Sequence, residues 1–110
     1  MKLAIVGSRN LTVEDLGAYL PEGVTEFVSG GARGVDACAR IYAQAHGIPI
    51  KEFLPDYPHY GRGAPLRRNR EIIAYADALL AFWDGQSHGT KHTIELCRQA
   101  EKPVTVILLA

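Results

Sequence analysis

Residues 1–7 read Met-Lys-Leu-Ala-Ile-Val-Gly, a short apolar run that ends in glycine. Strands that are buried on both faces of a parallel sheet have this pattern, because helices cover both sides and no solvent-facing residue interrupts the run. The stretch therefore predicts a central strand of an α/β domain, and the other elements can be placed around it.

Four further apolar segments follow along the chain, and helix-like segments separate them. Strands are expected at 25–29, 48–54, 78–83 and 104–109. Helices are expected at 12–19, 35–46, 65–75 and 90–101, with a loop at 55–63. Strands that alternate with helices favour a parallel sheet with helices on both faces.

This pattern predicts a Rossmann-like three-layer α/β domain with a five-stranded, mainly parallel sheet, in the order 3-2-1-4-5. A flavodoxin-like order also satisfies the right-handed crossover rule, and we favour the Rossmann-like one. Thr12 and Thr90 are predicted to cap the helices that begin there. Pro65 stands where a first helical turn accepts proline.

Length and composition indicate a single domain that spans residues 1–110. Twelve basic and twelve acidic residues give a net charge of zero, which argues against broad non-specific nucleic-acid binding but leaves room for a local basic patch. No leader peptide is expected, and no apolar run approaches the ~20 residues of a membrane span. We therefore expect a cytoplasmic protein without a membrane partner.

Cysteine and histidine spacing gives no sign of a metal centre. Cys38 and Cys97 lie within apolar helical patterns, and we expect buried free thiols. His88 and His92 are one helical turn apart, but no third ligand accompanies them. No metal or other cofactor is expected.

Loops rich in glycine follow three of the predicted strands. The carboxyl ends of parallel strands meet at one edge of the sheet, so these loops are expected to converge there, near the switch point between the first and fourth strands. Glycine lets backbone approach a phosphate closely, and the amides at a helix start favour an anion. The residues predicted to bind a phosphate-bearing ligand here are Gly7, Ser8, Arg9, Ser29, Gly30, Gly31, Ala32, Arg33, Gly34, Asp84, Gly85, Gly89 and Thr90. The alternative is that the glycines merely form tight turns, and neither a Walker A nor a GxGxxG pattern is present.

The predicted helix at 65–75 begins with a basic segment, Pro-Leu-Arg-Arg-Asn-Arg-Glu. Leu66, Asn69 and Ile73 share one face at ~100° per residue. A buried asparagine needs hydrogen-bond partners, so Asn69 is predicted to brace the site, with capping of the helix as the alternative. We expect Arg67 and Arg70 to reach phosphate, and Arg68 to be a solvated surface charge.

Three aromatic residues, Tyr57, Tyr60 and Trp83, occupy loop or strand-end positions. Such positions suit stacking on a nucleobase. Packing at the rim of the core is the alternative, and it is the commoner role of aromatic residues there.

Taken together, Gly7-Ser8-Arg9, the stretch Ser29–Asp36, the stretch Pro65–Glu71 and Gly89-Thr90 resemble the SLOG superfamily. This superfamily includes the lonely-guy phosphoribohydrolases, DNA-processing protein A, molybdenum-cofactor carrier proteins and stand-alone YspA/YpsA-like domains, which this chain resembles most. The resemblance implies a Rossmann-like fold and a site for nucleotides or nucleotide-derived ligands. The enzyme branch carries Pro-Gly-Gly-x-Gly-Thr-x-x-Glu, whereas here Thr93 stands in the place of the glutamate and the Pro-Gly-Gly is absent.

Three functions follow, of which we favour the first: binding or sensing of a nucleotide-type small molecule without chemistry. The second is hydrolysis of the N-glycosidic bond of nucleoside 5′-monophosphates, with Glu71 and Asp36 as catalytic carboxylates. The third is binding of single-stranded DNA with modest affinity, along Arg9, Arg33, Arg62, Arg67 and Arg70. The alanine-rich helix face at 37–45 would allow a homodimer, and it would equally pack on the chain's own sheet.

Overall fold

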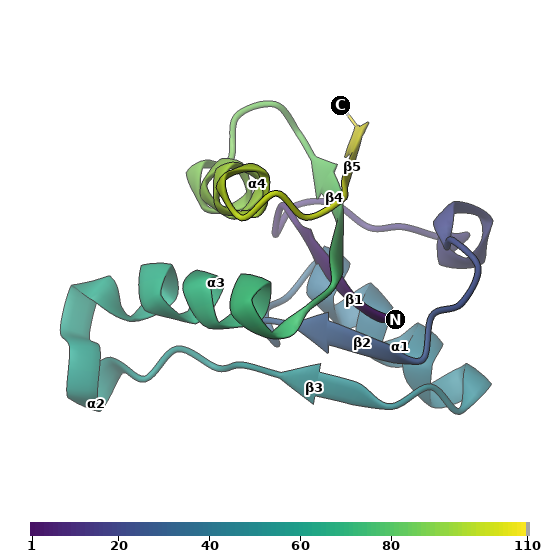
Figure 1. Cartoon of the computed structure of the whole chain (residues 1–110), viewed down its shortest axis with the longest axis horizontal. Coiled ribbons are helices and arrows are strands. Elements are labelled where there is room, and N and C mark those ends of the chain that lie inside the picture. Colours follow the sequence, from purple (N-terminus) through teal and green to yellow (C-terminus); the bar gives the residue numbers. More distant parts are fainter. Residues whose placement is uncertain (110) are drawn as a thin grey trace.

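In the computed structural model, which describes residues 1–109, five parallel strands form one sheet in the order β3-β2-β1-β4-β5 (Figure 1). The strands are β1 (Lys2–Gly7), β2 (Glu26–Ser29), β3 (Ile50–Glu52), β4 (Ala78–Trp83) and β5 (Val104–Leu108). In the centre, Leu3 of β1 lies opposite Phe27 of β2 and Ala78 of β4. The predicted Rossmann-like fold and strand order are confirmed, and every neighbouring pair is parallel.

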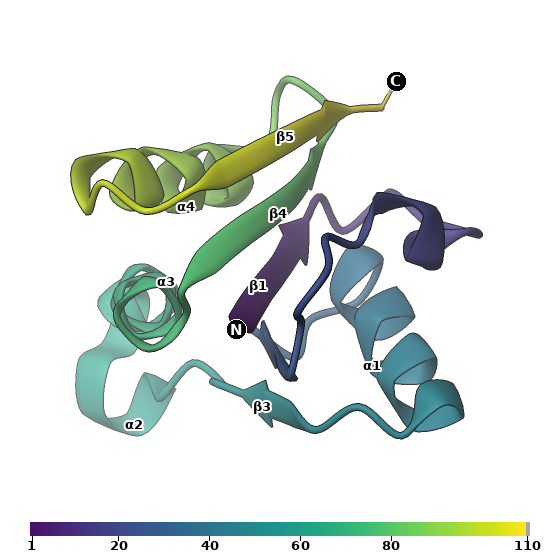
Figure 2. The same ribbon diagram turned by 45° about the vertical axis from the view of Figure 1, so that its right-hand side comes forward.

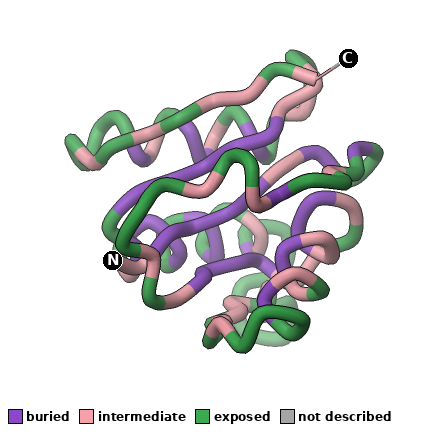
Figure 3. The backbone as a smooth tube through the Cα atoms, turned by 90° about the vertical axis from the view of Figure 1, so that its right-hand side faces the viewer, coloured by how far each residue is buried: buried purple, intermediate pink, exposed green. Residues whose placement is uncertain are grey.

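Helices cover the sheet on both faces, which gives the three layers seen in Figure 2. On one face, α1 (Val35–His46) and the 3-10 turn η1 (Leu16–Tyr19) pack on Leu3 and Ile5. On the other face, α3 (Ala64–Tyr75) and α4 (His88–Gln99) pack on Ala4 and Val6. Successive residues of β1 thus point to opposite layers, and the central strands are buried along their length (Figure 3).

The helix expected at 12–19 is wrong: residues 12–15 are irregular, and the second half forms only the 3-10 turn η1. The Val13 amide donates to the Cys38 sulfur at 3.4 Å, which ties this segment to α1. Thr12 is exposed and precedes an irregular segment, and it caps no helix. A tertiary contact therefore decides this connection.

Three other boundaries differ from those expected. The strand expected at 48–54 is confined to β3, whose start follows Pro49. The loop expected at 55–63 contains the short helix α2 (Tyr57–Tyr60), capped by the Asp56 side chain, and the 3-10 turn η2 (Gly61–Gly63). Ser87 takes the N-cap position of α4, so Thr90 does not cap that helix.

The thiols and the alanine-rich helix have distinct environments. Cys97 is buried, and burial raises the pKa of its thiol, whereas Cys38 is only half-buried. Ala39 and Ala43 of α1 lie in the core, so the alanine-rich face packs on the chain's own sheet. Within residues 1–109, the helices are all too short or too polar to cross a bilayer.

Candidate functional site

A cavity of about 750 Å³ lies at the carboxyl edge of the sheet, at the switch point between β1 and β4. Its walls come from the loops after β1 and β2 and from the first turns of α3 and α4. Cavities of ~300–1,000 Å³ are typical of small-molecule sites. The converging edge predicted from the glycine-rich loops is therefore a hollow of ligand size.

The cavity wall contains only part of the predicted set of site residues. Those that line it are Gly7, Ser8, Arg9, Gly30, Ala32, Arg33, Asp36, Asn69, Gly89 and Thr90. Those outside the lining are Ser29, Gly31, Gly34, Arg67, Arg70, Glu71, Asp84 and Gly85. Residues that line it without having been predicted as site residues are Val6, Asn10, Pro65, Leu66, Arg68, Ile72, Ser87 and Thr93.

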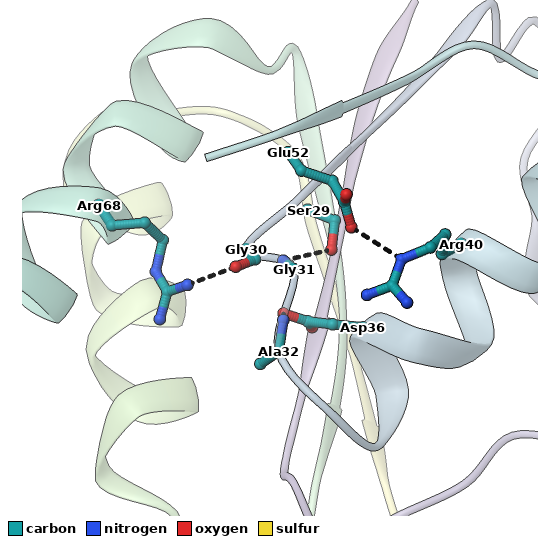
Figure 4. A network of polar contacts seen from close by, with 8 residues as sticks. All are labelled: Ser29, Gly30, Gly31, Ala32, Asp36, Arg40, Glu52 and Arg68. Atoms are coloured by element: carbon teal, nitrogen blue, oxygen red, sulfur yellow. Dashed lines mark hydrogen bonds and ion pairs between the residues drawn. The ribbon is translucent and has the colours of Figure 1, made fainter. Parts of the chain in front are cut away.

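In the loop after β2, two backbone amides already donate hydrogen bonds to side-chain oxygens of the protein itself (Figure 4). The Gly31 amide donates to Ser29 Oγ at 3.2 Å, and the Ala32 amide donates to Asp36 Oδ2 at 3.1 Å. Asp36 thus takes the position that a ligand oxygen would need at Ala32. Burial raises the pKa of this carboxyl group, against the opposing effects of the Ala32 amide and the Arg68 charge.

The loops after β1 and β4 hold each other in place. Ser8 donates its amide to Phe82 O at 3.1 Å and accepts the Asp84 amide on Oγ at 3.2 Å. The Asp84 carboxylate accepts the amides of Ser87 at 2.8 Å and Gln86 at 2.9 Å, and these donors lower its pKa. Asp84 therefore shapes the entry to α4 and is not among the residues that line the cavity.

Three helices begin at the cavity, and no side chain caps any of them. Their N-cap residues are Gly34 for α1, Gly63 for α3 and Ser87 for α4. The first amides of a helix have no acceptor inside it and carry part of the positive end of its dipole. Only α1 has an acidic residue in its first turn; the Ala64 amide at the start of α3 donates to Gly61 O, and the Asp84 carboxylate accepts the Ser87 amide at the start of α4.

Arg68 is buried, so its prediction as a solvated surface charge is wrong. Its residue is 8% exposed, and its guanidinium donates from Nη1 to Gly30 O at 2.7 Å and from Nε to Asn69 Oδ1 at 3.1 Å. No carboxylate within residues 1–109 lies within 4.0 Å of it. Burial lowers the pKa of the guanidinium, which the Asp36 charge partly opposes. A buried cation without an ion-pair partner thus faces the cavity.

Asn69 is buried, as the helical pattern predicts, while Leu66 of the same predicted face is largely exposed. The side-chain oxygen of Asn69 accepts a hydrogen bond from Arg68, and Asn69 Nδ2 lies 3.3 Å from His92 Nδ1 of α4. The residue links α3 to α4, and the capping alternative does not apply because Gly63 is the N-cap.

The two predicted catalytic carboxylates lie in different environments. Asp36 lines the cavity. Glu71 is exposed on α3, with Arg67 Nε 3.9 Å from its Oε1. Thr93, at the position of the glutamate in the enzyme branch, lines the cavity and donates from its hydroxyl to Gly89 O at 3.0 Å. Among the described residues, no three His, Cys, Asp or Glu side chains are grouped to hold a metal ion.

The aromatic residues separate into two groups. Trp83 is half-buried and donates from Nε1 to Ser87 O at 3.0 Å, so it supports the loop before α4. Tyr57 and Tyr60 of α2 are 54% and 45% exposed, and the Arg67 guanidinium lies 4.6 Å from the centre of the Tyr60 ring. Neither tyrosine belongs to the packed core.

Comparison with known proteins finds a solved structure of similar architecture. The structure aligns over 100% of its length with DNA processing protein A from Helicobacter pylori, with a TM-score of 0.77, 25% sequence identity and coverage of 66% of that chain. The fold is Rossmann-like and SLOG-related. The H. pylori structure was described for its single-stranded DNA binding mode.

One sequence relative is the gene 61 protein of Mycobacterium phage D29. It is 37% identical over 83 residues, which cover 70% of this chain and 66% of that protein. This chain thus spans slightly less than two thirds of both relatives. No family model matches the sequence.

Proposed function

We propose that this protein binds a nucleoside monophosphate, or a related small phosphate-bearing nucleotide, in the cavity between β1 and β4 as a binding or sensing module. The single observation behind this proposal is the Arg68 guanidinium, which is buried, faces the cavity and has no carboxylate partner among residues 1–109. Buried charges are normally paired, because an isolated charge is costly to remove from water. The Asp36 charge acts on this guanidinium from beyond 4.0 Å, and a bound phosphate would give it a direct ion pair.

The start of α4 supports a position for that phosphate. Gly89 and Thr90 line the cavity there, their helix lacks a side-chain cap, and its first turn contains no acidic residue. Arg9 lines the same cavity from the loop after β1. We infer that the phosphate binds between the α4 start and Arg68, with the ligand's hydroxyl groups toward the Asp36 carboxylate.

The comparisons are consistent with a nucleotide-type ligand. The DNA bound by the Helicobacter protein is itself a chain of nucleotides. The structural alignment with that protein covers the whole of this chain. Assignment to the stand-alone YspA/YpsA-like branch of the superfamily belongs to the same proposal, because Thr93 occupies the place of the hydrolase glutamate.

Isothermal titration calorimetry with AMP and other nucleoside monophosphates tests this proposal. Arg68→Met should weaken binding by about tenfold or more, since a hydrogen bond to a charged group contributes about 1.5–3 kcal/mol. Arg70→Met is the matched control, because Arg70 lies on the same helix, is exposed and is outside the lining. Equal affinity for Arg68→Met and the wild type, with both variants folded by circular dichroism, would sink the proposal.

The ligand recovered after long incubation distinguishes binding from chemistry. Chromatography should return the monophosphate intact. Release of free base that depends on Asp36, and disappears in Asp36→Asn, would instead establish the hydrolase function.

A second candidate, binding of single-stranded DNA, is favoured by a strip of exposed apolar and aromatic side chains beside the cavity. We define the strip as Leu54, Tyr57, Tyr60 and Leu66, all of them largely exposed. Leu66 also lines the cavity, and Leu54 lies against Gly31 of the loop after β2. Bases stack on exposed aromatic rings with little regard for sequence, and Arg67 beside Tyr60 offers a phosphate contact.

Fluorescence anisotropy with a labelled oligo(dT) tests this candidate. The double variant Tyr57→Ala/Tyr60→Ala should weaken oligonucleotide binding while AMP binding stays the same. Leu108→Ala serves as the control, because Leu108 is an exposed apolar residue of β5 that is not part of the strip or the cavity lining. If the double variant binds the oligonucleotide as the wild type does, the strip is not a DNA contact.

A further inference from the structure

Four groups form a continuous chain of hydrogen bonds from the loop after β2 to α4. Arg68 Nη1 donates to Gly30 O at 2.7 Å, as Figure 4 shows. Arg68 Nε donates to Asn69 Oδ1 at 3.1 Å, and Asn69 Nδ2 lies 3.3 Å from His92 Nδ1. The cation on which the proposed function depends is therefore tied, through one amide, to an imidazole that is not among the cavity residues.

The chemistry of these groups fixes every donor in the chain. A guanidinium Nε–H can only donate, so Asn69 must present its oxygen to Arg68 and its NH₂ to His92. An amide NH₂ can only donate as well, so His92 Nδ1 must accept. The ring is therefore neutral in this arrangement and carries its proton on Nε2.

Burial makes the arrangement sensitive to that proton. Asn69 is 7% exposed, so a lost hydrogen bond cannot readily be replaced by water. A protonated ring donates from both nitrogens, which leaves two donors facing each other between Asn69 and His92. Rotating the Asn69 amide would satisfy His92 but would turn NH₂ toward Arg68 Nε, and that bond would be lost instead.

We propose that His92 is a positioning residue for the cavity: its neutral imidazole holds Arg68 against Gly30 by way of Asn69, and protonation of the ring releases Arg68. The inference builds on the proposed function, because it describes how the anion site is regulated. It predicts anion binding that weakens in acid. Simple attraction between a protonated ring and an anion predicts the opposite.

Other charged groups on the elements that pack against α4 have to be separated from this effect. The strands β4 and β5 carry none, and β1 contributes Lys2 at its far end. The groups on α3 and on α4 itself are Arg67, Arg68, Arg70, Glu71, His88, Lys91, Glu95 and Arg98. All of them are unchanged in His92→Gln, so a comparison with the wild type isolates the ring. In the cavity, burial raises the pKa of Asp36, and this group too is common to both proteins.

The test uses sulfate as the probe, because sulfate keeps its charge from about pH 8 to about pH 5.5, the range in which histidine side chains gain a proton. Wild-type affinity for sulfate should fall by about tenfold over this range, equivalent to about 1.4 kcal/mol. In His92→Gln the side-chain oxygen can still accept from Asn69 and cannot titrate, so its affinity should stay near the wild-type value at pH 8 and remain flat. His88→Gln, which removes the other imidazole of α4, should keep the wild-type loss. Affinity that rises in acid, or a loss that persists in His92→Gln, overturns the inference.

A second measurement needs no ligand and so separates this inference from the proposed function. Nitrogen-15 NMR of the free protein should show His92 protonated on Nε2 at about pH 8, with a slowly exchanging Arg68 Nε–H that becomes fast-exchanging at about pH 5.5. In His92→Gln the Arg68 signal should not change with pH. A ring protonated on Nδ1 at high pH overturns the inference. If the signals behave as expected while sulfate and AMP fail to bind, the proposed function is wrong and the positioning role stands.

Discussion

At the residue scale, tight backbone contacts hold the loops of the cavity in place. A Cβ on Gly7 would lie 2.6 Å from Phe82 O and would meet the Val35 side chain, and one on Gly34 would lie 2.5 Å from Arg9 O at a φ of +75°. Gly7 thus lets β1 and β4 approach the start of α1, and Gly34 lets the β2 loop pass the β1 loop. These two glycines bring the cavity walls together through packing and do not themselves have to touch a ligand.

Gly7→Ala should therefore destabilise the fold. The added methyl meets a backbone oxygen of β4, which cannot move without disturbing the sheet, and overpacking of this kind costs about 1–3 kcal/mol. Gly63→Ala is the matched control, because nothing lies within 4 Å of its added Cβ and its φ is −80°. Urea unfolding should show a lower free energy of unfolding for Gly7→Ala alone. Similar values for both variants would contradict the proposed close approach.

A second residue-scale prediction concerns Asp84 and acid. The Ser87 and Gln86 amides lower the pKa of its carboxyl group below the ordinary value of 3.8. At a pH between the folded-state pKa of Asp84 and its ordinary pKa, the unfolded chain binds more protons than the folded chain. The stabilisation by Asp84 is therefore complete above the ordinary pKa and disappears as the pH falls through the folded-state pKa. Asp84→Ala should be less stable than the wild type in urea at neutral pH, and the difference should shrink as the pH falls below the ordinary value of 3.8. A difference that does not vary with pH would mean that the carboxylate charge is not involved.

At the element scale, the C-terminus of α3 depends on one lysine from the turn before β5. Lys102 Nζ donates to the carbonyl oxygens of Ile73 at 2.6 Å, Ala76 at 2.8 Å and Ala74 at 3.3 Å. The last carbonyls of a helix have no partner inside it, and a cation there also offsets the negative end of the dipole. Lys102 thereby fastens α3 to the segment that leads out of α4.

Lys102→Met keeps the alkyl chain and removes the donors, so it should lower the free energy of unfolding by about 1–2 kcal/mol. Lys91→Met is the control, since Lys91 is exposed on α4 and exposed substitutions usually change stability by less than about 0.5 kcal/mol. Hydrogen exchange should also show faster exchange of the last amides of α3 in Lys102→Met. Unchanged exchange would show that the helix end is held by other contacts.

Sequence reasoning succeeded where local pattern and tertiary structure agree. The segment at 35–46 becomes α1 because its alanine-rich turns face the sheet and Gly47 can adopt the left-handed conformation that ends it, at a φ of +66°. The five strands follow in the same way from apolar runs, and the crossover rule leaves few possible orders, of which the favoured Rossmann-like one is observed. The convergence of the loops then follows from the parallel topology.

Sequence reasoning failed where a distant partner decides the outcome. Arg68 looked like a surface charge because nothing local to α3 shows that Gly30 O, 38 residues earlier, would accept a hydrogen bond from its guanidinium. The segment around Val13 followed a helical pattern, yet its amide bonds to Cys38. The asparagine was easier to place, because a polar residue on an apolar face points to a partner even when the partner, His92, cannot be named.

At the scale of the whole molecule, the distribution of charge and the fold together bear on which ligand the proposed site would select. Twelve acidic residues balance twelve basic ones, so the protein as a whole has no net field to attract polyanions. Positive charge is instead concentrated at one edge of the sheet, where Arg9, Arg33 and Arg68 line the cavity. Under the proposed function, fit within the cavity would therefore select the ligand more than long-range attraction does.

Salt dependence should therefore separate the two candidate ligands. If the protein contacts three phosphates of a single DNA strand, its affinity for the strand should fall by more than about tenfold between about 50 and 200 mM salt. The logarithm of the affinity falls with the logarithm of the salt concentration by about 0.7 per contacted phosphate. AMP held by the buried Arg68 should lose only about twofold, since buried charges are screened much less than exposed ones. Calorimetry for AMP and anisotropy for oligo(dT), each repeated in Lys91→Met as a control outside the cavity, measure both slopes. An AMP affinity that falls as steeply as that of the oligonucleotide would place the bound phosphate on exposed arginines and not at Arg68.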